Sequence, residues 1–314
     1  MLLALIISEV SCTKNPDNYT ITEDPVYHRR DSITLTLINS IQEDSIKSTV
    51  HWLQEMGTRF ALSENNRKVA FSIKKKFIGT GLTDTHIDSF QVTINWRNNI
   101  YVQWQYNVIA HLHGTEYSDS LSVIGAHYDN ILSSGDPYVF VPGADDNASG
   151  VAAVLEIARV MVKNNYSPWG SINFIAFGAE EEGLHGSASY AAKSLITGEN
   201  IIMMLNNDMI AYEPDFRIPY WDVNIINYDN SFSLLKLAKN LCLQYTSLIS
   251  VNDNTDYQRS DSYSLYLKGF KALYFASRKK NPYYHTINDI STNCNFEYCR
   301  EVAKISCALL VLKN

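Results

Sequence analysis

LSVIGAHYDNILSSGDPYVFVPGADDNASGVAAVLEIARVMVKN, residues 121–164, contains the two kinds of segment that decide the fold. It begins with a strand that is apolar throughout, 121–127, and it ends with an alanine-rich helix, 148–164. A strand without polar alternation is buried on both faces, which is typical of a parallel sheet that helices cover. The stretch therefore predicts an α/β unit.

The same alternation continues along the rest of the chain. Further buried strands are predicted at 171–179, 201–212 and 269–276, and further helices at 185–196, 231–245 and 295–313. Upstream, the apolar spacing predicts helices at 31–58 and 65–79 and two alternating strands, 87–94 and 101–114, which would form an antiparallel edge. We expect a single α/β domain with a mostly parallel (mixed), twisted sheet and helices on both faces.

The composition is that of a folded, acidic protein. Of the 314 residues, 46% are hydrophobic and 19% are charged, which excludes a disordered chain. The net charge of −7 argues against nucleic acid as a partner, because binding phosphates requires a basic face. No run of 18 uncharged apolar residues occurs, so no transmembrane helix is expected.

The N-terminus is similar to the apolar part of an export signal. MLLALIISEVSC, residues 1–12, ends at Cys12, a candidate lipid acceptor, although no basic residue precedes it and Glu9 interrupts it. We expect residues 1–25 to be an export signal or an N-terminal arm, and the protein to be extracytoplasmic: in the periplasm, on the cell envelope or secreted. The other cysteines are expected to be structural thiols, and whether Cys294 and Cys299 pair stays open.

Acidic and histidine side chains collect where the predicted strands end or the following helices begin. The set comprises His127, Asp129, Asp145, Asp146, Glu180, Glu181, Glu182, Asp208 and His285. Taken singly, each has an ordinary explanation, such as a helix cap or a solvated charge. In open α/β sheets, however, the carboxyl ends of the strands meet at one edge, where these carboxylates would repel one another unless cations neutralise them.

The ligand types indicate which cations would do so. Two imidazoles and several carboxylate oxygens suit zinc, with manganese or cobalt as alternatives. Five ligands that share one carboxylate can hold two ions, and one glutamate would remain free as the base for metal-assisted hydrolysis.

Five motifs resemble, in order, those of the secreted bacterial di-zinc aminopeptidases, co-catalytic zinc exopeptidases related to glutaminyl cyclases. They are GAHYDN (125–130), PGADDNASGVAAVLEIAR (142–159), FGAEEEGLHGS (177–187), LNNDMIAY (205–212) and YYHTINDI (283–290). The resemblance covers about residues 40–312. It implies a zinc peptidase catalytic domain over 26–314 and a peptide substrate with a free N-terminus. We expect a monomer, although the sequence leaves the oligomeric state open.

The resemblance also implies a role for each site residue. The first zinc would be bound by His127 and Asp208, the second by Glu181 and His285, and Asp145 would bridge both ions. Glu180 would be the general base, and Tyr284 would polarise the scissile carbonyl. Asp129 would orient His127, and Asp146 would follow Asp145 through a cis peptide bond.

The sequence departs from the family pattern at two positions. Glu182 stands where the family usually has an apolar residue, and we expect it to be solvated, with Glu180 and Glu181 as the functional pair. Asp261 is followed by Ser262 where the family usually has histidine, which puts any role for that position in doubt.

Other functions of the same scaffold stay open. A glutaminyl cyclase would bind one zinc and perform acyl transfer instead of hydrolysis. Carboxypeptidases and dipeptidases of similar fold commonly carry an inserted dimerisation domain, and no insertion of about 100 residues interrupts this chain. A non-catalytic scaffold would have lost its metal ligands. The loops 210–230 and 250–265 would set which substrate side chain is preferred, and the motifs leave that preference open.

Overall fold

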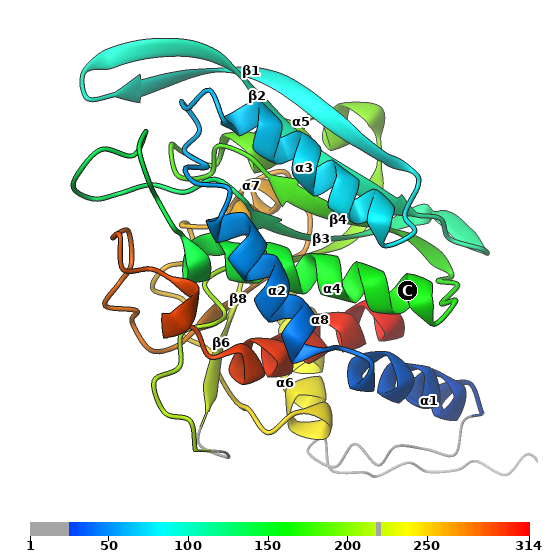
Figure 1. The fold of residues 1–314 in the computed structure, drawn as a ribbon. Coiled ribbons are helices and arrows are strands. Elements are labelled where there is room, and N and C mark those ends of the chain that lie inside the picture. Colours follow the sequence, from blue (N-terminus) through cyan, green and yellow to red (C-terminus); the bar gives the residue numbers. More distant parts are fainter. Residues whose placement is uncertain (1–24, 218–220) are drawn as a thin grey trace, which may run out of the picture.

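The structure is a computed structural model that describes residues 25–217 and 221–314, with side chains from Arg30 onward. The predictions for the export signal and for Cys12 concern residues outside these ranges. Within them, one sheet runs through the molecule and helices pack on its two faces (Figure 1).

Within the described ranges, the sheet has eight strands in the order β1-β2-β4-β3-β5-β8-β6-β7. The strands are β1 (Thr85–Trp96), β2 (Asn99–Leu112), β3 (Tyr117–His127), β4 (Gly170–Phe177), β5 (Asn200–Asn207), β6 (Asp222–Asn227), β7 (Ile249–Val251) and β8 (Ala272–Ser277). Strands β4, β3, β5 and β8 are parallel, whereas β1 and β2 form an antiparallel hairpin at one edge. The predicted mixed sheet with an antiparallel edge is confirmed.

Helices cover both faces of the sheet. They are α1 (Pro25–Asn39), α2 (Glu43–Gln54), α3 (Asn66–Gly79), α4 (Gly150–Lys163), α5 (His185–Thr197), α6 (Phe232–Tyr245), α7 (Asp261–Tyr266) and α8 (Phe296–Lys313). Shorter helical turns occupy Ala144–Ser149, Asp229–Ser231 and Ser291–Asn293.

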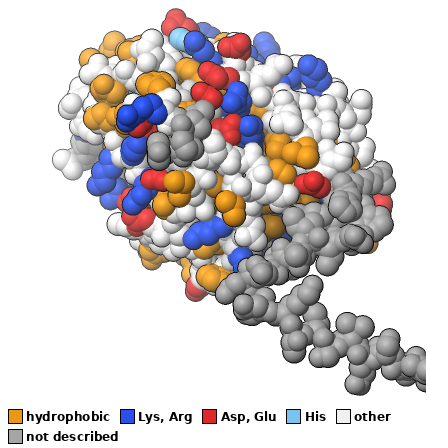
Figure 2. All heavy atoms as spheres, turned by 90° about the horizontal axis from the view of Figure 1, so that it is seen from below, with side chains coloured by type: hydrophobic (Ala, Val, Ile, Leu, Met, Phe, Trp, Pro, Cys, Tyr) orange, Lys and Arg blue, Asp and Glu red, His pale blue; other side chains and the backbone are white. Residues whose placement is uncertain are grey.

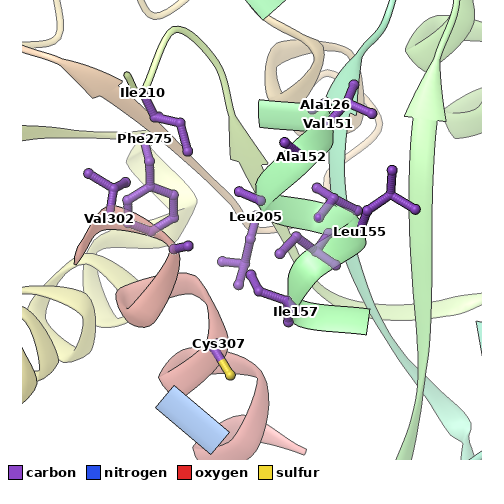
Figure 3. Close-up of a cluster of buried hydrophobic side chains, with 14 of the residues drawn as sticks. Ala126, Val151, Ala152, Leu155, Ile157, Leu205, Ile210, Phe275, Val302 and Cys307 are labelled. Atoms are coloured by element: carbon purple, nitrogen blue, oxygen red, sulfur yellow. The ribbon is translucent and has the colours of Figure 1, made fainter. Parts of the chain in front are cut away.

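The two faces have separate hydrophobic cores. Because side chains alternate along a strand, Ile124 of β3 lies in the core with α2, α4, α6 and α8, whereas Val123 lies in the core with α5 and α7. In the larger core, Leu155 of α4 and Val302 of α8 pack near Leu205 of β5 (Figure 3). Burial on both faces explains why the central strands carry no polar alternation.

The observed elements differ from the predicted ones where local contacts override periodicity. The predicted helix 31–58 is divided into α1 and α2, because the buried carboxylate of Glu156 accepts hydrogen bonds from Gln42 N and Ser45 Oγ at the start of α2. The predicted strand 201–212 ends at Asn207, ahead of Met209, whose φ is +55°. The short elements β6, β7 and α7 were not predicted.

The four cysteines from Cys242 to Cys307 are free and buried in the structure, so Cys294 and Cys299 are not paired with each other. Among the helices of the described ranges, none is long and apolar enough to cross a membrane. On the face shown in Figure 2, acidic, basic and apolar side chains lie interspersed.

Candidate active site

The candidate site lies at the carboxyl ends of the parallel strands. His127 is the last residue of β3, Glu180 follows β4, and Asp208 follows β5. Asp146 lies in the turn that leads into α4, and His285 lies in the loop after β8. The strand order places β3 between β4 and β5, so residues from distant parts of the sequence meet at one edge.

The first group of candidate ligands surrounds His127. Its Nε2 lies 3.2 Å from Oδ1 of Asp146 and 3.3 Å from Oδ1 of Asp208. All three side chains are buried, and their ligand atoms lie within 4.8 Å of one another. One imidazole nitrogen and two carboxylate oxygens at this spacing can hold a metal ion.

The second group surrounds His285. Its Nε2 lies 3.1 Å from Oδ2 of Asp146 and 2.9 Å from Oε2 of Glu181. The two groups therefore share Asp146, which directs one carboxylate oxygen toward each histidine.

The structure contradicts the assignment of the shared position to Asp145. Oδ1 of Asp145 accepts a hydrogen bond from Ala211 N at 2.7 Å, and Oδ2 accepts one from Asn281 Nδ2 at 2.9 Å. Both oxygens are thus used to fix the loop, and Asp146 occupies the shared position instead. The cis peptide bond joins Asp146 to Asn147, one residue later than expected.

Glu180 lies beside the two groups without belonging to either. It is 8% exposed, and its Oε2 is 4.0 Å from His127 Nε2. Burial raises its pKa well above the usual range against the opposing charge of His127, and the negative charge of Asp208 adds to the rise. In the metal-free site, Glu180 therefore holds a proton more readily than an ordinary glutamate does.

Asp129 holds the backbone of Glu180 and Glu181, the two glutamates that were predicted to be functional. Its carboxylate oxygens accept hydrogen bonds from Glu180 N and Glu181 N, both at 3.1 Å. The expected contact with His127 is made mainly by the backbone, because Nδ1 of His127 lies 3.2 Å from the carbonyl oxygen of Asp129 and 3.8 Å from its Oδ1. The backbone carbonyl thus fixes the imidazole, and the carboxylate fixes the loop after β4.

Glu182 is not solvated, in contrast to the prediction. Both of its carboxylate oxygens are buried and have no hydrogen-bond partner in the described chain. Burial raises the pKa of Glu182 well above its usual range, and the charges of Asp129 and Glu181 raise it further. The third glutamate thus adds a buried acid beside the site.

Tyr284 lies at the rim of the site. Its ring stacks on His285, with centroids 3.7 Å apart and an angle of 22° between the ring planes, and the residue is 43% exposed. Partial burial raises the pKa of Tyr284, and nearby carboxylates raise it further, so the hydroxyl keeps its proton at neutral pH.

Sequence reasoning missed three residues that support the site. Ser260 Oγ donates to Oδ2 of Asp208 at 2.5 Å, whereas Asp289 and Arg59 bind the backbone around Asp146. Asp289 stands within the quoted motif 283–290 and could have been considered. Ser260 directly precedes Asp261, a position that the family pattern also covers, whereas nothing in the sequence around Arg59 indicates a role.

The electrostatics of the site fit a bound cation. Burial raises the pKa of Glu181 to about 7, and its Oε1 is buried without a hydrogen-bond partner among the residues that the structure describes. Burial alone would lower the pKa of His285, but the hydrogen bonds that its ring donates to Asp146 and Glu181 outweigh burial and raise the pKa to about 10. An unsatisfied buried oxygen among crowded carboxylates is expected where a positive ion completes the site.

Comparison with known proteins gives the family. Residues 107–310 match the sequence profile of peptidase family M28. A probable leucine aminopeptidase of Arthroderma otae is 27% identical over 301 residues, which cover 92% of this chain and 76% of the relative. A probable zinc metalloprotease of Pyrenophora teres f. teres is 32% identical over 187 residues, which cover 55% of this chain and 40% of the relative.

Solved structures agree on the fold. LapB from Legionella pneumophila is 26% identical with a TM-score of 0.75, and the match covers 90% of this chain and 75% of LapB. A glutaminyl cyclase of Bacteroides thetaiotaomicron, bound to N-acetylhistamine, is 17% identical with a TM-score of 0.70 over 87% of this chain and 98% of the cyclase. The second likeness concerns the fold alone.

The expected fold and family are confirmed by these matches. The profile covers every residue of the two candidate ligand groups, from His127 to His285. The chain is therefore a peptidase by descent and belongs to peptidase family M28.

Proposed function

We propose that the chain is a zinc-dependent aminopeptidase that binds two zinc ions and uses Glu180 as its general base. The leucine aminopeptidase and zinc metalloprotease names of its relatives support the metal and the reaction. In this proposal the first ion is held by His127, Asp146 and Asp208, and the second by Asp146, Glu181 and His285.

The sharing of Asp146 carries the proposal. Two triplets with a common carboxylate are the ligand set that a pair of neighbouring ions requires. The donors are imidazole nitrogen and carboxylate oxygen, and every one of the five belongs to a buried or half-buried residue. When bound, zinc would lower the pKa of a water molecule and polarise the scissile carbonyl.

The protein's own groups would then move the proton. Glu180 would accept a proton from the attacking water and later deliver it to the leaving amine. Asp129 supports this role, because its carboxylate fixes the backbone amides of Glu180 and Glu181. Tyr284 would donate its hydroxyl proton in a hydrogen bond to the carbonyl oxygen as negative charge develops there.

The surplus of acidic groups supports an amino-terminal substrate. The described site contains Asp146, Asp208 and Glu180 to Glu182 around two imidazoles. Two bound zinc ions would offset four of these five negative charges, and the negative charge that remains would favour a protonated α-amine over the terminal carboxylate of a peptide.

Metal analysis combined with a substrate panel tests the proposal. Purified protein should contain two zinc ions per chain and hydrolyse amino-acyl arylamides, and a chelator should abolish the hydrolysis reversibly. A glutaminyl peptide belongs in the same panel. One zinc per chain together with cyclisation of that peptide would instead identify a glutaminyl cyclase, and no chelator-sensitive turnover would indicate a scaffold.

We also propose that the protein is an extracytoplasmic monomer, attached to lipid at Cys12. The apolar stretch 1–12 supports this location. Cell fractionation of the native chain and of Cys12→Ser tests it: the native chain should be in the membrane fraction and the variant should not. Size-exclusion chromatography tests the monomer.

A further inference from the structure

Two buried polar side chains lie on either side of the segment 142–146, which ends at Asp146. One is the guanidinium of Arg59, from the loop between α2 and α3, and the other is the carboxylate of Asp289. Neither is among the candidate metal ligands. Their partners are peptide groups of the segment that carries the shared carboxylate.

Arg59 binds the carbonyl side of this segment. It is fully buried, and it donates from Nη1 to Pro142 O at 2.9 Å and from Nη2 to Gly143 O at 2.7 Å. Its Nε donates to Tyr128 O at 2.7 Å, directly between His127 and Asp129 in the sequence. One side chain therefore ties the end of β3 to the segment that carries Asp146.

Asp289 binds the amide side. Its Oδ1 accepts a hydrogen bond from Asp145 N and its Oδ2 accepts one from Asp146 N, both at 3.0 Å. Its own carbonyl oxygen accepts a hydrogen bond from Ala144 N at 2.9 Å. Because Asp289 follows His285 by four residues, it ties the segment of the second histidine to that of Asp146.

The segment leaves no space for a side chain at Gly143. Gly143 has φ +49°, and a Cβ added there would lie 2.5 Å from Asp146 O and 2.8 Å from Arg59 Nη2. Burial lowers the pKa of Arg59 to about 10 while surrounding carboxylates, Asp289 foremost, raise it. Arg59 therefore stays charged at neutral pH, and its guanidinium lies on the carbonyl side of the segment that carries Asp146.

We propose that Arg59 and Asp289 are positioning residues that hold Asp146 with one carboxylate oxygen toward each histidine. This inference rests on the proposed zinc-binding function. The carbonyl oxygens of Pro142 and Gly143 and the amides of Ala144, Asp145 and Asp146 each have a fixed partner, so Asp146 is held in place before metal binds. Loss of either partner should therefore weaken metal binding.

Asp289→Asn tests the carboxylate side with a change of almost no volume. The amide nitrogen of the asparagine would face one of two backbone N–H groups, so Asp145 N or Asp146 N would lose its acceptor. Zinc affinity, measured by competition with a chelator, should fall about 10- to 100-fold. The visible absorption spectrum of the cobalt-substituted protein should change, because it reports the geometry of the ligands.

Glu156→Gln is the matched control. Glu156 is also a buried carboxylate that accepts a backbone N–H, from Gln42 at 2.7 Å, but it lies between α2 and α4 and belongs to neither ligand group. This variant should lose thermal stability yet keep wild-type zinc affinity and the wild-type cobalt spectrum.

Arg59→Lys tests the guanidinium side and replaces Asp289→Asn if that variant does not fold. Lysine keeps the charge but cannot donate to four carbonyl oxygens at once. Arg59 donates to those of Tyr128, Pro142 and Gly143 and also to that of Leu53, at 3.2 Å. The zinc affinity of the variant should lie below wild type, with an altered cobalt spectrum.

The inference is overturned if Asp289→Asn or a folded Arg59→Lys keeps the wild-type zinc affinity and cobalt spectrum. It is also overturned if Glu156→Gln weakens zinc binding as much as they do. Failure of the wild-type protein to bind zinc is a different result, because it would overturn the proposed function itself.

Discussion

At the scale of single residues, Asp146 has the most consequential position, because its two oxygens face two different histidines. The adjacent acid, Asp145, uses both oxygens for hydrogen bonds to Ala211 and Asn281. Two neighbouring aspartates with the same chemistry thus have unrelated tasks. The division follows from which way each side chain leaves the turn before α4.

Asp146→Asn should therefore bind zinc far more weakly at both positions, because a neutral amide replaces the shared carboxylate. Asp145→Asn should keep both ions and lose only stability, by about 1–3 kcal/mol, because one buried hydrogen bond is impaired. Metal content after dialysis and urea unfolding separate the two effects. Loss of zinc in Asp145→Asn alone would restore the original assignment.

Glu180→Gln should retain zinc while turnover falls between about 100-fold and 10,000-fold, because the amide cannot accept the proton of water. Glu182→Gln is the control, since Glu182 is buried nearby but is not placed in the reaction. It should keep most of its activity. Steady-state rates on an amino-acyl arylamide, with zinc content measured in parallel, decide the matter, and the reverse pattern would contradict the role of Glu180.

The shared carboxylate was predicted at Asp145 and lies at Asp146, which shows how far prediction from single residues reaches. The sequence motifs identified the acids and histidines that meet at the sheet edge, but they could not tell Asp145 from Asp146, because chemistry and neighbourhood are almost the same. No motif indicated Arg59, and the family pattern near Ser260 pointed to its neighbours Asp261 and Ser262 instead. The tasks of Arg59 and Ser260 depend on hydrogen bonds to distant parts of the chain, which only the folded geometry reveals.

At the scale of elements, the fold places the site through the order of its strands. Apolar runs without alternation predicted β3, β4, β5 and β8, because burial on both faces leaves a strong signal. The three-residue strand β7 and the six-residue helix α7 were missed, because each element is too short to show a periodic pattern of apolar residues. The break between α1 and α2 was missed because a tertiary contact causes it.

That contact centres on Glu156, whose carboxylate binds Gln42 N, Ser45 Oγ and the guanidinium of Arg159. Glu156→Ala should lower the free energy of unfolding by about 2–4 kcal/mol, because buried donors lose an ionised acceptor. Urea unfolding measures this. A loss below about 0.5 kcal/mol, the size of a typical surface substitution, would show that the contact does not anchor α2.

At the scale of the whole molecule, the site concentrates buried acids in a protein that already carries a net charge of −7. Metal binding should therefore stabilise the entire fold, because ions that bind the native state contribute their binding free energy to folding. The protonation of the metal-free site opposes this binding.

Zinc affinity should accordingly rise with pH. The pKa of His285 is raised to about 10 in the metal-free chain, so near neutral pH zinc must displace a proton from it. The same raised pKa stabilises the metal-free fold below about pH 6.5, and that stabilisation is lost as pH rises toward 10. Chelator competition between pH 6 and 8 should show affinity rising about tenfold per unit for each displaced proton. A zinc affinity that does not change between pH 6 and 8 would contradict the inference that His285 is protonated in the metal-free protein.

The most direct test of the central claim is the zinc content of the purified wild-type protein beside Asp146→Asn. Two ions per chain in the wild type, and loss of both in the variant, are expected from a shared carboxylate. A single tightly bound ion in the wild type, or two ions retained by Asp146→Asn, would contradict it.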